Sequence, residues 1–383
     1  MSNALQTRLE QGFEAHFGTR PDFVIRAPGR VNLIGEHTDY NGGFALPAAI
    51  SLETQIAVRA SSSESVEVAA LDFGEDDSFL PRRDLQKSAK GGWRDYIRGS
   101  VLSAIEAGYE VPGVQLAVAG SIPKGTGLSS SASLEVGIIT ALLELTKRSV
   151  DPKVVALLAQ KAENDFVGMR CGNLDQLASA ATEAGAALLI DCRSLMTRSI
   201  NFPEDAVILI IQSGVTRGLV EGEYNRRRAE CEQAAKVLGV AALRDANMNM
   251  LEAARDRMDP VVFRRARHII TDNRLTLEAA DALTANDLTS LGGMMRESHA
   301  SQRDDFGITV PDTDRLADIM NAAIGGDGGA RQTGGGFGGA VVGVLRADRL
   351  EAVKSAVRDK YQTPAGHVPD IYVERPHAGA GLI

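Results

Sequence analysis

The first third of the chain alternates short apolar runs with polar turns. Residues 114–119 alternate apolar and polar side chains, which is typical of a strand with one buried face. Shorter runs of β type occur at residues 23–26, 44–46, 54–58 and 66–71. The pattern predicts a strand-rich beginning, interrupted by one amphipathic helix at residues 93–107.

The middle of the chain is helical, and one of its helices has no polar face. Alanine, leucine and isoleucine dominate residues 129–147, and apolar side chains cover nearly every side of a helix drawn through them. A helix of that kind is buried. Further helices are expected at residues 152–168 and 172–182, and a short apolar strand follows at 186–190.

The second half repeats the mixture of strands and helices. Buried strands are expected at residues 206–211 and 340–345, helical stretches between about 221 and 324 and at 350–360, and a last strand at 371–374. We therefore expect an α+β fold in two lobes, residues 1–195 and 196–383. A single larger domain remains open, because no flexible hinge is visible.

Composition narrows the class of protein. The 383 residues carry 41 basic and 50 acidic side chains, a net charge of −9, which argues against binding nucleic acid by bulk electrostatics. No apolar stretch approaches about 18 residues, so we expect no membrane contact through a spanning helix. The three cysteines form no CxxC pair and the six histidines no HExxH, which predicts a reducing, cytoplasmic location without zinc.

A glycine- and serine-rich segment lies between a predicted strand and the buried helix. It consists of Pro123, Lys124, Gly125, Thr126, Gly127, Leu128, Ser129, Ser130 and Ser131. Glycines let the backbone approach a ligand closely, and the first amides of a helix lack internal partners. Together with the helix dipole these features favour an anion, most simply a polyphosphate. A capped helix after a turn would have the same sequence.

Two further segments of the chain are rich in glycine. Residues 26–43 hold Arg30, Glu36, His37, Asp39 and Asn41 around an apolar stretch, so we expect Arg30 to lie beside a core strand. Residues 334–339 satisfy GxGxxG, but they precede a strand, which excludes the dinucleotide-binding interpretation. No Gly-Lys pair exists, so a Walker A loop is also excluded.

In this order the three segments resemble the three motifs of the GHMP small-molecule kinases. Residues 29–40 resemble the galactokinase signature nearly letter for letter, and the blocks 171–176, 189–195 and 223–227 are also similar to that family. The resemblance implies a ribosomal-S5-like N-terminal lobe and a ferredoxin-like C-terminal lobe. ATP and galactose would meet in the cleft between them, and the γ-phosphate would pass to the anomeric hydroxyl of α-D-galactose.

The resemblance also assigns roles to residues. Asp175 would be the catalytic base, and Arg30 would stabilise charge beside it. Mg²⁺ would be held by Ser131 and Glu163, and ATP by residues 124–131 with Trp93 against the adenine. The galactose-binding set would be Glu36, His37, Asp39, Gly172, Asp175 and Tyr224.

Two other functions remain open at this stage. A GHMP kinase for N-acetylgalactosamine or arabinose would differ only in the shape of the sugar pocket. A non-catalytic sugar sensor should lack a group needed for transfer, whereas Arg30, Ser131, Glu163 and Asp175 are all present. The sequence leaves the oligomeric state unknown and favours a monomer.

Overall fold

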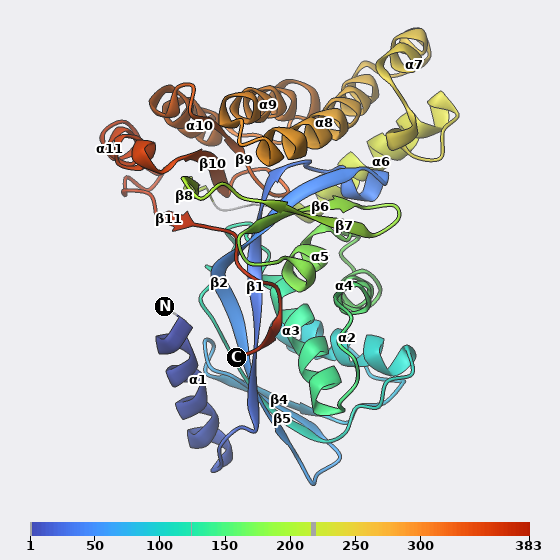
Figure 1. Ribbon diagram of the computed structural model, residues 1–383. Coiled ribbons are helices and arrows are strands. Elements are labelled where there is room, and N and C mark those ends of the chain that lie inside the picture. Colours follow the sequence, from blue (N-terminus) through green and yellow to red (C-terminus); the bar gives the residue numbers. More distant parts are fainter. Residues whose placement is uncertain (1, 124, 216–219) are drawn as a thin grey trace.

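The structure is a computed structural model that describes residues 2–123, 125–215 and 220–383. Figure 1 shows two lobes, each built on a sheet with helices against it. The first sheet has eight strands, in the order β12 (Gly381–Leu382), β1 (Phe23–Ile34), β2 (Phe44–Ala60), β5 (Val114–Gly120), β3 (Val66–Ala70) and β4 (Glu75–Phe79), with β6 (Ala186–Asp191) and β7 (Met196–Asn201) attached through β2. The second has four, in the order β11 (Ile371–Glu374), β8 (Ala206–Gln212), β10 (Ala340–Arg346) and β9 (Gly328–Gln332).

Helices cover both sheets. The first lobe carries α1 (Ser2–Phe17), α2 (Trp93–Glu106), α3 (Ser130–Leu145), α4 (Pro152–Lys161) and α5 (Leu174–Ala181). The second carries α6 (Val220–Leu238), α7 (Met248–Ala253), α8 (Pro260–Thr284), α9 (Leu288–Ser301), α10 (Pro311–Ile324) and α11 (Leu350–Lys360). The buried helix expected from residue 129 is confirmed as α3, and the two-lobed α+β architecture is confirmed with it.

The hairpin of β1 and β2 is much longer than its sequence pattern predicts. The two strands pair antiparallel from Phe23↔Val58 to Ile34↔Leu46, with irregularities between Pro28 and Arg30 and between Asn32 and Ile34. Polar residues interrupt the apolar pattern, so the sequence predicts only short strands here. Polar residues of these strands are buried with hydrogen-bond partners, as Asn32 is with Glu36 and Gln55 is with Glu53.

The two lobes share a hydrophobic core. Leu33 of β1 and Ile50 of β2 belong to the same cluster as Ile210 of β8. Leu275 of α8 and Leu291 of α9 complete this cluster from the second lobe. The far end of the β1–β2 hairpin is therefore packed against the second lobe, in a core to which both lobes contribute.

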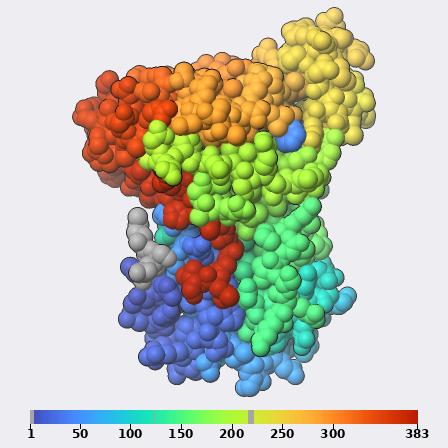
Figure 2. Space-filling view, viewed as in Figure 1, coloured from blue at the N-terminus to red at the C-terminus, as the bar shows by residue number. Residues whose placement is uncertain are grey.

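The end of the chain returns to the first lobe as a strap. After β11, the amides of His377 and Gly379 donate to the carbonyls of Ala49 and Thr182, and β12 pairs with β1 at Ile25↔Leu382. Figure 2 shows this red segment lying across the blue and green surface of the lower lobe. Residues 381–382 thus belong to the first sheet.

Strand pairing also bears on the expected boundary near residue 195. That residue lies in the turn of the β6–β7 hairpin, and the four-stranded sheet begins only with β8 at Ala206. The three cysteines are free thiols. In the described part of the chain, no helix combines the length and apolarity needed to cross a bilayer.

Neighbouring glycines of α9 test how closely the second lobe is packed. A Cβ added to Gly292 would lie 1.8 Å from the carbonyl oxygen of Gly328 on β9, whereas one added to Gly293 would meet nothing within 4 Å. We expect Gly292→Ala to lower the free energy of unfolding by about 1–3 kcal/mol through overpacking. Gly293→Ala is the matched control and should raise it by about 0.5–1 kcal/mol, because alanine favours helix. Chemical denaturation measures both, and equal effects would contradict the close contact.

Candidate active site

Arg30 occupies a fixed position on β1 because the neighbouring Gly29 lets the backbone of the serine-rich segment approach. A Cβ on Gly29 would lie 2.6 Å from the carbonyl oxygen of Leu128. The amide of Arg30 donates to that same oxygen at 3.2 Å. The Arg30 side chain is 7% exposed, which confirms the expectation that it lies beside a core strand.

An ion pair joins Arg30 to Asp175 at the first turn of α5. Nε and Nη2 of Arg30 lie 2.7 and 2.5 Å from Oδ1 of Asp175, and Nη1 donates to the Gly127 carbonyl at 2.8 Å. The hydroxyl of Ser129 donates to Oδ2 of the same carboxylate. Both Asp175 oxygens are thus held in place, while 32% of the side chain remains exposed to the cavity.

The serine-rich segment wraps the start of α3. Gly125, Gly127 and Ser129 have positive φ values of 73°, 79° and 61°, so the backbone turns sharply before the helix begins at Ser130. A left-handed serine is an uncommon conformation, and here it directs the hydroxyl to Asp175. The Thr126 hydroxyl donates to the Pro123 carbonyl at 2.7 Å and closes the turn. Lys124, also assigned to ATP binding, lies outside the described residues.

These elements border a cavity of about 290 Å³ between the lobes. Most of the residues that the sequence assigned to ligands line it: Arg30, Glu36, His37, Asp39, Gly125, Gly127, Leu128, Ser129, Ser130, Ser131, Glu163, Gly172, Asp175 and Tyr224. Residues as far apart in the chain as Arg30 and Tyr224 therefore meet in one place.

Glu163 and Ser131 lie side by side at the edge of this cavity. Glu163 is 3% exposed and accepts hydrogen bonds from Gln176, at 2.7 Å, and from Ser131. Burial, and then the charge of Asp175, raises the pKa of Glu163 to about 7. Glu135 of α3 is fully buried close to Glu163, and burial raises its pKa well above the ordinary value. Acidic side chains are therefore crowded at this edge, and the crowding favours their protonated forms.

Asp39 lies opposite, in the short turn Asp39–Asn41. A Cβ on Gly172 would lie 2.0 Å from Oδ2 of Asp39, so only glycine leaves room for this carboxylate. Burial raises the pKa of Asp39 to about 6, despite the opposing backbone hydrogen bond from Tyr40. Asp39 and Gly172, which sequence analysis assigned to the same ligand, are thus direct neighbours.

Glu36 is held from both lobes. Its carboxylate accepts from Arg331 of β9 at 2.5 Å, from Asn32 at 2.7 Å and from the amide of Gly334 at 2.7 Å. Its backbone amide donates to Asp272 of α8 at 2.8 Å. Sequence analysis did not identify Arg331 or Asp272, because single charged residues in a short strand and in a long helix carry no local motif.

His37 and Tyr224 form an aromatic wall of the cavity. The His37 ring lies 5.1 Å from that of Tyr224 and 4.8 Å from that of Phe306. Its Nδ1 is 2.8 Å from the Tyr40 hydroxyl and its Nε2 is 3.3 Å from the Gly335 carbonyl. Both ring nitrogens of His37 therefore have protein partners, which favours a shaping role for the imidazole.

Trp93 is not among the residues that line this cavity. It begins α2, and its ring stacks on Phe73 at 6.2 Å while its Nε1 donates to Glu75 at 3.2 Å. The guanidinium of Arg94 lies 4.5 Å from the ring centre. The adenine role of Trp93 stays a prediction.

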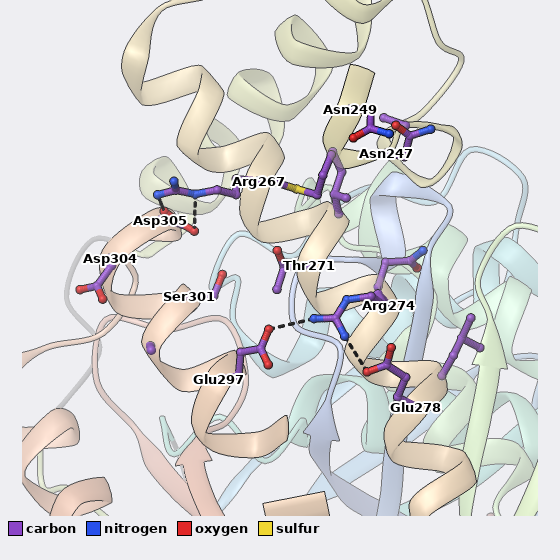
Figure 3. Close-up of a pocket in the computed structure, with 16 residues that line it drawn as sticks. Asn247, Asn249, Arg267, Thr271, Arg274, Glu278, Glu297, Ser301, Asp304 and Asp305 are labelled. Atoms are coloured by element: carbon purple, nitrogen blue, oxygen red, sulfur yellow. Dashed lines mark hydrogen bonds and ion pairs between the residues drawn. The ribbon is translucent and has the colours of Figure 1, made fainter. Parts of the chain in front are cut away.

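A larger groove of about 980 Å³ lies on the outer surface of α8 and α9 (Figure 3). Both of its arginines are held in ion pairs: Arg267 pairs with Asp305, and Arg274 pairs with Glu278 and Glu297 (Figure 3). None of the residues that the sequence assigned to ligands is among those that line this groove. The smaller cavity is therefore the candidate active site.

The chemistry of the candidate site is that of phosphoryl transfer. Helix-start amides suit a phosphate chain, and a carboxylate paired with a guanidinium suits proton acceptance beside a charged transition state. No three His, Cys, Asp or Glu side chains within the described ranges form a metal-binding group.

Family models match three parts of the chain. They are the galactokinase galactose-binding signature at residues 11–60, the GHMP kinase N-terminal domain at 95–183 and the GHMP kinase C-terminal domain at 279–363. The first match contains Arg30, Glu36, His37 and Asp39, and the second contains Ser131, Glu163 and Asp175.

Solved structures agree with these matches. Mevalonate kinase from Methanococcus jannaschii is 18% identical with a TM-score of 0.67 over 93% of this chain and 98% of its own, which shows a shared fold. The galactokinase of Lactococcus lactis, solved in complex with galactose, is 33% identical with a TM-score of 0.93, covering 99% of this chain and 100% of its own. Likeness of that extent, together with the three family matches, shows that the chain belongs to the galactokinase family of GHMP kinases.

Proposed function

We propose that the protein transfers the γ-phosphoryl group of ATP to the anomeric hydroxyl of α-D-galactose, producing galactose 1-phosphate and ADP. Family membership supports the reaction, since the galactose-binding signature spans residues 11–60. The observation that carries the mechanism is the ion pair of Arg30 and Asp175, which borders the same cavity as the residues at the start of α3.

Asp175 acts as the base in this mechanism. The anomeric O–H gives its proton to the carboxylate, the sugar oxygen bonds to the γ-phosphorus, and the bond from that phosphorus to the bridging oxygen of ADP breaks. Ser129 and Arg30 hold the carboxylate from two sides, so the base meets the hydroxyl without reorganisation. Arg30 offsets charge that accumulates on the transferred group.

Mg²⁺ is the proposed cation. Ser131 and Glu163 offer one hydroxyl and one buried carboxylate side by side, a donor set that suits an ion retaining several waters. When bound, Mg²⁺ would neutralise the β- and γ-phosphates. The raised pKa of Glu163 supports the fit, because a nearby cation relieves the crowding of carboxylates.

The sugar would lie against Asp39, Glu36 and Tyr224. Carboxylates fixed at different angles discriminate among hydroxyl arrangements, because an unpaired buried acceptor is costly. Galactose is favoured over N-acetylgalactosamine and arabinose by the matched signature and by the galactose-bound relative. A sensor is disfavoured because Arg30 and Asp175 form the ion pair that the transfer needs.

Asp175→Asn tests the base. The amide keeps the shape but cannot accept the proton, so we expect kcat to fall by roughly 10²–10⁴ while galactose binding persists. Coupled ADP release and calorimetric galactose titration measure the two properties. Asp165→Asn, which removes an exposed carboxylate paired with Lys161, is the control and should keep the wild-type rate. A near wild-type rate in Asp175→Asn would refute the assignment.

Ser131→Ala tests the cation. Removing one ligand should raise the Mg²⁺ concentration for half-maximal activity several-fold, with a smaller change at saturating Mg²⁺. Magnesium titrations of initial rate measure this. Ser78→Ala on β4, an exposed serine, serves as the control. An unchanged magnesium dependence in Ser131→Ala would remove this hydroxyl from the site.

Asp39→Asn tests how much the ionised Asp39 carboxylate lowers the free energy of unfolding. The pKa of Asp39 is about 6 in the folded chain against an ordinary 3.8, so the folded state binds more protons between these values and stability falls as pH rises through them. At about 1.4 kcal/mol per unit, the variant should be more stable than wild type by about 1–3 kcal/mol at pH 8 and equal near pH 4. Urea denaturation at both values measures this, and a difference independent of pH would contradict it.

A further inference from the structure

Arg331 is a buried cation that the reaction itself does not use. It lies on β9 with no exposed surface, and Nη1 contacts Glu36 at 2.5 Å and the Leu33 carbonyl at 3.2 Å. Its Nε and Nη2 have no hydrogen-bond partner in the part of the chain that the structure describes. An incompletely satisfied guanidinium is expensive to bury, so packing alone does not account for an arginine here.

We propose that Arg331 is a positioning residue that aims one oxygen of Glu36 at a single sugar hydroxyl and so helps to set sugar specificity. The inference rests on the proposed function, in which Glu36 contacts the sugar. Glu36 borders the cavity, whereas Arg331 does not. Arg331 therefore acts through Glu36.

The hydrogen bonds of Glu36 leave little freedom. A carboxylate offers about four acceptor positions. Oε2 accepts from Arg331 and Asn32, and Oε1 accepts from the amide of Gly334. The hydroxyl of Thr333 is 3.5 Å from Oε1 and has a shorter bond, 2.9 Å, to the Asn32 carbonyl. One position on Oε1 remains for a ligand, and its direction is fixed by the other three bonds.

Arg331 can be removed without releasing the backbone of Glu36. The Glu36 amide donates to Asp272, and its carbonyl lies 3.3 Å from Nε2 of His268. Both partners belong to α8 and are independent of β9. Loss of Arg331 should therefore loosen the carboxylate alone, which would keep its bonds from Asn32 and Gly334 but would face the nearby Asp272 without a counter-charge.

The position of Arg331 makes it a rigid support. β9 is paired along β10, with Arg331 opposite Val342, so the guanidinium stem is anchored in a sheet of the second lobe. Glu36 follows β1 of the first lobe. Because the ion pair spans the lobes, it fixes the position of the Glu36 carboxylate relative to the Gly334 loop. Selective binding requires fixed geometry of this kind.

The experiment compares Arg331→Met and Glu36→Gln with wild type, using Mg-ATP, galactose and its four monodeoxy analogues lacking the hydroxyl at carbon 2, 3, 4 or 6. We expect Arg331→Met to raise the galactose KM about tenfold or more while the ATP KM changes less than about twofold, the pattern of lost sugar binding. For wild type, one analogue should have a much lower kcat/KM than galactose. For both variants, the same analogue should lower kcat/KM much less.

Two further variants keep the test decisive. Arg331→Lys retains a charge and should recover part of the galactose KM. Arg331→Met combined with Glu36→Gln leaves no buried charge unpaired, and it should match Glu36→Gln alone, because coupled residues are not additive. The galactose KM of this double variant can be compared with that of Glu36→Gln even if Arg331→Met alone does not fold. Arg346→Met, at the exposed end of β10 beside Asp205, is the control and should change neither KM.

A purely structural role predicts other results. A parallel rise of both KM values, a fall in kcat with an unchanged galactose KM, or different critical hydroxyls for the two variants would overturn the positioning role. If wild type phosphorylates another sugar of a panel and not galactose, the proposed function fails. The Arg331 comparison then proceeds with deoxy analogues of that sugar and is judged by the same criteria.

Discussion

The structure depends on burying a polar loop between two lobes. The end of the β1–β2 hairpin lies within a hydrophobic core that both lobes supply, so its polar groups are largely removed from water. Buried polar groups need partners, and here the partners come from other parts of the chain. Arg30 finds Asp175, Glu36 finds Arg331, and Asp39 fits against Gly172. The candidate site consists largely of these paired groups.

The serine-rich segment supplies partners and packing for the same buried groups. Its backbone packs against Gly29, its Ser129 hydroxyl reaches Asp175, and its last residues begin a helix that is buried on nearly all sides. A buried helix cannot move to follow a ligand, so the amides at its start are fixed in direction. This rigidity suits a reaction in which the protein contributes mainly position and charge.

Much of this arrangement could be predicted from the sequence because its signals are local. The apolar helix α3, the strands β8 and β10, and the glycine motifs all appear within short windows, and the motif resemblance brought Arg30 and Asp175 together correctly. The long strands β1 and β2 were underestimated because their polar residues, such as Asn32, are paired only in the tertiary structure.

Other features could not be predicted because they depend on distant parts of the chain. Arg331 is recognisable only once β9 lies beside Glu36. The contacts of the His37 ring with Tyr40 and with the Gly335 carbonyl also appear only in the folded chain, and its assignment to the sugar stays a prediction. The acidic excess around Glu163 includes Glu135, which in sequence is one residue of a hydrophobic helix.

The strap at the end of the chain has a consequence for synthesis. β12 pairs with β1, so the sheet that the first strand begins is completed only by residues 381–382. Because residues 381–382 are made after every strand of the second sheet, β1 can gain this neighbour only once the second lobe has been synthesised.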